Sequence, residues 1–195
     1  MEKARDEELM LRYQEGDMTA MDELLARYKN PVYRFAYRLS RDASDAQDIA
    51  QEVFLRVHQF RGRYEPSGKF STWIFSIAHN LFVSRLRKDK WQVNWPRQKD
   101  DPEKLMDFAS NQPSVQEQVS RNEFSALVKK HIQGLPFLQK EALVLREYEQ
   151  LDYEEIAKIL NKSLGTVKTL IHRARLALKE KLLPYASEIS EGLNE

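Results

Sequence analysis

The sequence predicts an all-α protein made of two small helical domains joined by a flexible linker. Apolar residues recur along most of the 195 residues at the three- and four-residue spacing of amphipathic helices. From about Gln92 to Gln118 this spacing disappears, and Pro96, Pro102 and Pro113 interrupt a polar, acidic stretch. A chain of this length can also bury a real core in one or two domains. We therefore expect an N-terminal helical domain over residues 1–91, a linker over 92–120, a C-terminal helical domain over 121–183 and an acidic tail over 184–195.

Composition narrows the class of protein. The chain is 42% hydrophobic and 31% charged, as soluble globular proteins are, and it has no apolar run long enough to span a bilayer. It contains no cysteine, which excludes disulfides and thiolate metal sites and favours a reducing cytoplasm. The net charge is only +1, but residues 56–91 hold 8 Lys and Arg against 2 Asp and Glu, and residues 121–183 hold 12 against 8. Two separate basic segments predict two contacts with a polyanion.

The first informative helix is expected over Asp45–Phe60. One face is an apolar stripe at helical spacing, formed by Ala46, Ile49, Ala50, Val53, Phe54, Val57 and Phe60. The opposite face carries Asp48, Gln51 and Glu52, with Leu55 as an apolar residue among them. A lone exposed leucine is common, but a leucine rimmed by polar groups is also typical of the centre of a protein-binding patch. Spacing alone leaves both interpretations open.

The second informative segment is a loop followed by a basic helix. The loop Phe60–Phe70 mixes aromatic side chains, cations and glycines, and the helix is expected from Ser71 or Thr72 to about Lys90. Such a mixture suits unstacked bases, because a base can stack on a ring while cations follow its phosphates. Phe70 and Trp73 also fit the inner stripe of the helix and are more typical of a core. The better candidates for direct contact are Lys69, Asn80, Arg85, Arg87 and Lys88.

The C-terminal domain is expected to be a four-helix unit that ends in a helix-turn-helix. Tyr153, Ile156, Ala157 and Leu160 share one face of a short helix, and Ser163 is the expected N-cap of the next. In that second helix Val167, Ile171, Ala174 and Leu178 form the buried stripe. The other side presents hydrogen-bond donors, namely Lys168, Thr169, His172 and Arg173. This pattern predicts a helix that reads bases in a major groove, whereas the alternative is an ordinary helical hairpin with a solvated basic face.

These patterns bear on whether the chain is an enzyme or a DNA-binding protein. The donor-rich helix favours a DNA-binding protein over an enzyme, because the four histidines are scattered without ligand spacing and the carboxylates lie on polar helix faces. We therefore assign no catalytic residue, no metal ligand and no cofactor. Among DNA-binding proteins, one alternative is a helix-turn-helix transcriptional regulator whose N-terminal domain senses a ligand or dimerises. That alternative predicts stable duplex binding, usually at a two-fold symmetric site.

Three motifs together carry a family resemblance. Asp45-Ala-Gln-Asp-Ile-Ala-Gln-Glu-Val-Phe-Leu-Arg-Val, Lys69-Phe-Ser-Thr-Trp-Ile-Phe-Ser-Ile-Ala-His-Asn, and the run from Tyr153-Glu-Glu-Ile-Ala through Gly165-Thr-Val-Lys to His172-Arg-Ala-Arg strongly resemble a bacterial RNA polymerase sigma factor. The resemblance is to the extracytoplasmic-function group of the sigma-70 family, and it covers roughly residues 7–183. It implies a transcription initiation factor that binds core RNA polymerase, directs it to promoters and helps to melt them.

The resemblance also implies a role for each surface. Asp48, Gln51, Glu52 and Leu55 would dock on the clamp coiled coil of the largest polymerase subunit, and the C-terminal domain would contact the flap region. The helix Gly165–Ala177 would read the promoter −35 element through Lys168, Thr169, His172 and Arg173. The −10 element would be bound, with one base flipped out, by Lys69, Phe70, Trp73, Asn80, Arg85, Arg87 and Lys88. The implied partners are core RNA polymerase, promoter DNA and, as a further candidate, an anti-sigma factor.

Overall fold

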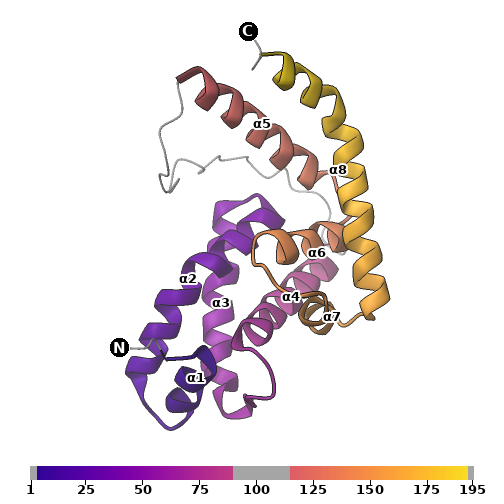
Figure 1. Ribbon diagram of the computed structural model, residues 1–195. Coiled ribbons are helices and arrows are strands. Elements are labelled where there is room, and N and C mark those ends of the chain that lie inside the picture. The colour runs from indigo at the N-terminus through magenta and orange to yellow at the C-terminus, as the bar shows by residue number, and fades with distance from the viewer. Residues whose placement is uncertain (1–3, 90–114, 193–195) are drawn as a thin grey trace.

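The computed structural model describes residues 4–89 and 115–192, which are helical apart from short turns and loops (Figure 1). No strand occurs in these two ranges, so the predicted all-α class is confirmed. The elements are α1 (Asp6–Gln14), α2 (Met18–Ser40), α3 (Ala43–Phe60), the 3₁₀ helix η1 (Arg61–Arg63), α4 (Phe70–Asp89), α5 (Val115–Gln133), α6 (Phe137–Glu147), α7 (Tyr153–Leu160) and α8 (Leu164–Gly192).

Helices α1 to α4 form the N-terminal half. Aspartates are the N-caps of α2 and α3. Asp17 accepts a hydrogen bond from the Thr19 backbone N–H at 2.9 Å, and Asp42 accepts one from the Asp45 backbone N–H at 2.8 Å. The predicted stripe of α3 packs inward, with Ala46, Ile49, Ala50, Val53 and Val57 all buried. Burial of one face explains why this helix presents its polar face outward.

The start of α4 is held by α1. The Glu7 carboxylate accepts a hydrogen bond from the Phe70 backbone N–H at 2.8 Å, and the Gln14 side-chain amide donates to the Tyr64 carbonyl at 2.9 Å. These contacts fix both ends of the loop between η1 and α4. The loop that precedes the basic helix therefore has a defined position on the N-terminal half.

Helices α5 to α8 form the C-terminal half. Ile132, Leu135, Leu143 and Ala174 make a small cluster that joins α5 and α6 to the middle of α8. Two boundaries differ from the prediction. Helix α5 begins at Val115, inside the range predicted as linker, and α8 continues through Pro184 to Gly192, into the range predicted as tail. A proline removes one backbone donor, and here that loss does not end the helix.

The two halves pack against each other. Helix α7 lies against α4, and α6 lies against α2 (Figure 1). One hydrophobic cluster runs from α1 through α4 into the C-terminal half, where Val144, Leu145, Ile156 and Ile171 belong to it. A polar, proline-interrupted linker permits both extended and compact arrangements. The described chain adopts the compact one.

Candidate nucleic-acid and protein interfaces

The helix-turn-helix is built by local capping on both sides of its turn. Asp152 caps α7 by accepting the Glu155 backbone N–H at 2.7 Å, and the Glu155 carboxylate accepts the Asp152 backbone N–H at 3.0 Å. Asn161 ends α7 in the left-handed region with φ of +50°. Ser163 then accepts the Thr166 backbone N–H at 3.2 Å, which confirms the predicted N-cap of α8.

The first half of α8 has one buried and one exposed face. Val167, Ile171 and Ala174 are buried against the other helices. The four predicted donors, Lys168, Thr169, His172 and Arg173, are all exposed on the other side. The neighbouring Arg175 has a different contact, because its guanidinium binds the Glu147 carboxylate of α6 at 2.5 Å. The exposed row is thus carried by a helix that is anchored along its opposite side.

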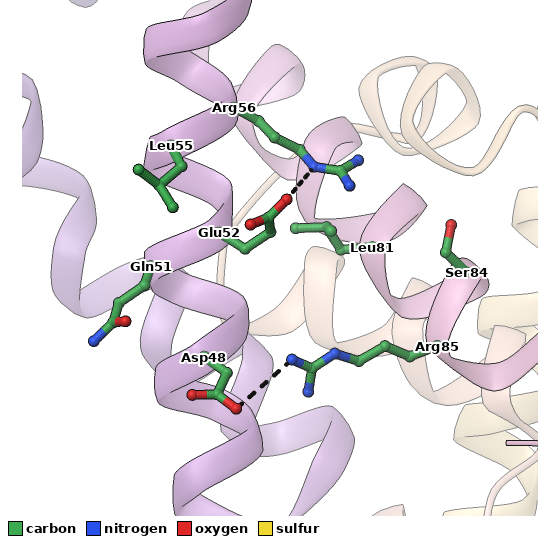
Figure 2. A pocket seen from close by; sticks show the side chains of 8 residues that line it. All are labelled: Asp48, Gln51, Glu52, Leu55, Arg56, Leu81, Ser84 and Arg85. Carbon is green, nitrogen blue, oxygen red and sulfur yellow. Dashed lines mark hydrogen bonds and ion pairs between the residues drawn. The ribbon is translucent and has the colours of Figure 1, made fainter. Parts of the chain in front are cut away.

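The outward face of α3 borders a surface groove shared with α4. Asp48, Gln51, Glu52 and Leu55 line it from α3, and Leu81, Ser84 and Arg85 line it from α4 (Figure 2). Leu55 is 55% exposed, whereas Val53 and Val57 on the inner face of the same helix are buried. All four side chains that the sequence analysis grouped on α3 therefore share one surface.

Ion pairs order the charged rim of this groove. Arg56 donates to Glu52 of the preceding turn at 2.8 Å, and Arg85 of α4 lies 3.8 Å from Asp48 (Figure 2). Arg85 also lies 3.2 Å from the Asp45 carboxylate. Arg85 was expected to contact DNA. In this structure its guanidinium forms ion pairs with Asp45 and Asp48 of α3. Arg85 therefore connects the surface predicted to bind polymerase with the surface predicted to bind the −10 element.

Aromatic side chains pack together where the loop enters α4. Phe70 is fully buried, and its ring lies edge-on to Tyr28 at 5.0 Å between ring centres. Trp73 is half-buried and lies 5.1 Å from the Tyr64 ring. A direct contact between Phe70 and a base would require the ring to leave the core. Phe70 belongs to the main hydrophobic cluster, and side chains of this cluster surround its ring.

The remaining predicted residues of α4 lie in different environments. Asn80 and Arg87 are exposed, and the side chain of Lys88 lies outside the part that the structure describes. His79, a polar residue of the same helix, is not exposed. His79 is buried, and its Nδ1 atom lies 2.8 Å from a carboxylate oxygen of Glu141 on α6. Glu141 is fully buried, and burial raises its pKa above the ordinary value.

Lys69 has two partners that the sequence analysis missed. Its ammonium lies 3.0 Å from the Glu155 carboxylate and 3.9 Å from that of Asp152, both at the start of α7. The hydrogen bond with Glu155 raises the pKa of Lys69. Thr72 donates to the same Glu155 oxygen at 3.2 Å. No sequence signal pairs residues separated by more than eighty positions, because only domain packing brings them together.

Comparisons with known proteins agree with this geometry. Residues 24–92 match the family model for sigma-70 region 2, and residues 126–178 match that for sigma-70 region 4. The RNA polymerase sigma-H factor of Pseudomonas aeruginosa is 33% identical over 94% of this chain and 97% of its own length. The ECF RNA polymerase sigma factor SigW of Bacillus subtilis is 34% identical over 86% of this chain and 91% of its own.

Solved structures of similar fold include a sigma factor. RpoE of Bartonella quintana, in complex with the anti-sigma factor NepR, has a TM-score of 0.65 at 24% identity, covering 83% of this chain and 96% of that one. CnrH, in complex with the cytosolic domain of CnrY, has a TM-score of 0.64 at 20% identity, covering 91% and 96%.

The two family matches identify a promoter-recognition protein of the sigma-70 type that has regions 2 and 4. The chain belongs to the extracytoplasmic-function group of RNA polymerase sigma factors. It is therefore a transcription initiation factor that directs RNA polymerase to promoters, and sigma factors are not themselves enzymes. The alternative of a ligand-sensing helix-turn-helix regulator does not fit a match to both sigma regions. Within the described residues, none of the helices has the length and apolarity required to cross a bilayer.

Proposed function

We propose that three surfaces of this sigma factor have separate binding roles in transcription initiation. The α3 face with Asp48, Gln51, Glu52 and Leu55 docks on the clamp coiled coil of the largest polymerase subunit. The exposed row of α8 reads the −35 element, and the loop and outer face of α4 bind the −10 element as the duplex melts. We place this activity in the cytoplasm, where bacterial RNA polymerase acts on the chromosome.

One observation carries the proposal: the side chains assigned to polymerase and to the −35 element lie on the solvent side of helices whose opposite faces are buried in a common core. Leu55 is 55% exposed beside the charged rim of the groove, and burying it against a partner would remove apolar surface from water. Thr169 and Arg173 lie on a helix fixed by Val167 and Ile171, so their spacing is rigid enough to match base edges.

Co-elution with core RNA polymerase tests the docking surface. We expect the wild-type chain to co-elute and the double variant Glu52→Arg, Leu55→Asp to be lost from the complex. A matched control is Glu180→Arg, Leu183→Asp, which makes the same changes at the same spacing on exposed positions of α8. If the control variant alone loses polymerase, or if the α3 variant still co-elutes with it, the main docking surface does not lie on α3.

Binding-site selection from a random DNA library tests the −35 surface in the presence of core polymerase. Arg173→Ala should weaken binding of the selected sequence by about 1–3 kcal/mol and relax preference at one position. Arg175→Ala is the control, since Arg175 binds Glu147 instead. If both variants select the same sequence as the wild type with the same affinity, Arg173 does not read the −35 element.

We also propose an anti-sigma protein as a candidate partner. Two solved proteins of similar fold are bound to other proteins, the sigma factor RpoE to the anti-sigma factor NepR and CnrH to the cytosolic domain of CnrY. An anti-sigma protein of this chain should displace core polymerase in the co-elution assay.

A further inference from the structure

The second half of α2 is basic although it lies in an acidic part of the chain. Residues 29–41 hold 4 Lys and Arg and no Asp or Glu, whereas residues 1–28 and 42–55 together hold 4 against 12. The four cations of α2 are Lys29, Arg34, Arg38 and Arg41. None of them belongs to the three surfaces proposed above. A cationic run inside an acidic segment indicates a contact with a polyanion at this place.

Two of these cations share one side of α2 with two tyrosines. The inner side of the helix is buried and consists of Val32, Phe35, Ala36 and Leu39. The other side, which we call the α2 face, consists of Tyr33, Arg34, Tyr37 and Arg41 at three- and four-residue steps. Arg34 is exposed, and the other three are partly exposed. The α2 face therefore remains accessible although α2 packs against α1, α3 and α6 (Figure 1).

Rings and guanidinium groups follow one another along this face. The Tyr33 and Tyr37 rings are nearly parallel, with an angle of 13° and 6.3 Å between their centres. The Arg41 guanidinium lies 5.7 Å from the centre of the Tyr37 ring, and that of Arg38 lies 4.0 Å from the Tyr148 ring beside the face. Single strands of nucleic acid are bound by this combination, because bases stack on rings while cations contact phosphates. The helix rises about 12 Å from Tyr33 to Arg41, which matches about two to four nucleotides.

The positive charge of this region is not neutralised by its neighbours. Within residues 4–89 and 115–192, neither Arg34 nor Arg41 forms an ion pair. Arg38 lies 3.9 Å from Glu149, but burial raises the pKa of that carboxyl to about 7, so it is only partly charged at neutral pH. Burial lowers the pKa of the neighbouring Lys140, and the charge of Arg41 lowers it further. A bound anion would relieve the repulsion among these cations.

We propose that the α2 face is a third DNA-binding surface, on which a single strand of promoter DNA places its phosphates at Arg34 and Arg41 and its bases on the rings of Tyr33 and Tyr37. The strand is DNA, because proteins of this class act on promoters. A closed duplex does not fit, since its bases stack on each other and cannot lie on the tyrosine rings. The inference goes beyond the −10 and −35 assignments and does not depend on either of them.

The salt dependence of binding tests the two phosphate contacts. The full-length chain is titrated into a short, labelled single-stranded DNA oligonucleotide of mixed sequence, without polymerase, at several salt concentrations. Each phosphate contact of a single strand contributes about 0.7 to the slope of log affinity against log salt, so Arg34→Gln, Arg41→Gln should lower the slope by about 1.4. At about 0.1 M salt this change weakens binding about 10- to 30-fold. The matched control is Lys179→Gln, Lys181→Gln, which removes two exposed cations of α8 beyond the helix assigned to the −35 element. Equal slopes in the two double variants would overturn the proposal.

A second variant tests the rings. Tyr33 also packs on the core, so Tyr33→Leu keeps an apolar side chain there while it removes the ring. Binding of the DNA oligonucleotide should weaken about fivefold or more, whereas Tyr185→Leu, which removes an exposed ring of α8, should bind as the wild type does. Thermal unfolding checks that both variants remain folded. If Tyr33→Leu is folded and binds as tightly as Tyr185→Leu, no base stacks on this ring and the single-strand assignment is wrong.

Photo-crosslinking locates the strand directly. An oligonucleotide that carries 5-iodouracil should crosslink to the peptide that contains Tyr33 and Tyr37, a result that a merely structural role of α2 would not produce. An RNA oligonucleotide of the same sequence is measured in parallel. If the α2 variants weaken binding of RNA but not of DNA, the occupant is RNA and the proposal is wrong. If Arg87→Gln on α4 weakens DNA binding while the α2 variants do not, the inference fails and the −10 assignment stands.

Discussion

The carboxyl of Glu149 should make the stability of the compact chain depend on pH. Glu149 follows α6, its side chain is only 9% exposed, and it lies 3.9 Å from the Arg38 guanidinium of α2. Arg38 also stacks 4.0 Å from the centre of the Tyr148 ring. Burial raises the pKa of Glu149 from the ordinary 4.5 to about 7, and the attraction of Arg38 only partly opposes it. The perturbed acid therefore sits in the contact between the two halves.

The sign and the size of the effect follow from linkage. Between the two pKa values the folded chain holds a proton on Glu149 that the unfolded chain has released, so protonation favours the folded chain. This contribution is complete below a pH of about 4.5 and is lost as the pH rises through about 7. For these pKa values the carboxyl stabilises the folded chain by about 2.5 kcal/mol more at about pH 5 than at about pH 8.

Urea unfolding of wild type and Glu149→Gln across this pH range measures the effect. Glutamine cannot titrate, so the difference between the two free energies of unfolding should change by about 2.5 kcal/mol from about pH 5 to about pH 8. Glu141 and Lys140 are present in both proteins and cancel in this comparison. Staying above about pH 5 also avoids Asp17, whose pKa is lowered to about 2 by its hydrogen bonds with Thr19 and Arg12.

A matched control uses an exposed acid. Glu65→Gln changes the same chemical group in the exposed loop before α4, and the effect of Glu149→Gln should depend on pH more strongly than the effect of this control. If the difference between wild type and Glu149→Gln does not change with pH, the carboxyl of Glu149 does not titrate near neutrality. The argument that burial outweighs the attraction of Arg38 would then be wrong.

Three further predictions concern single side chains. Ile156→Ala should cost about 2–5 kcal/mol in urea unfolding, because this fully buried side chain belongs to the core shared by both halves. Asp152→Ala should cost about 1 kcal/mol through loss of the α7 cap, while Asp152→Asn, which keeps a capping oxygen, should cost less; equal costs would exclude the cap as the cause. Leu55→Asp should change stability by no more than about 0.5 kcal/mol, which circular dichroism melting can check, so that any loss of polymerase binding reports on the surface.

Local features of this chain were predictable because their physics is local. The apolar stripe of α3 and the cap at Ser163 depend on residues within a few positions of each other, and the structure confirms both. Exposure of Leu55 followed from the same helical period. The assignment of the exposed residues to DNA or polymerase is still a prediction, and the experiments above decide it.

Residues at the contact between the halves were not predictable in the same way. His79 is a polar residue beside Asn80 in the sequence, yet it is buried because Glu141 of α6 gives it a buried partner. Phe70 fitted the core better than base contact from its spacing, and the Tyr28 and Tyr64 rings around it show the contacts that hold it in the core. In both cases the deciding atoms come from a different helix, which periodicity along one helix does not reveal.

By itself the sequence determined the helices, the helix-turn-helix, the two basic segments and the motifs of a sigma factor, because spacing and capping act over single turns. Only the tertiary structure decided how the two regions meet. A polar linker leaves that arrangement open, and the outcome depends on burial of α6 and α7 against α2 and α4. That packing brings Glu155 of the C-terminal half to Lys69 of the N-terminal half.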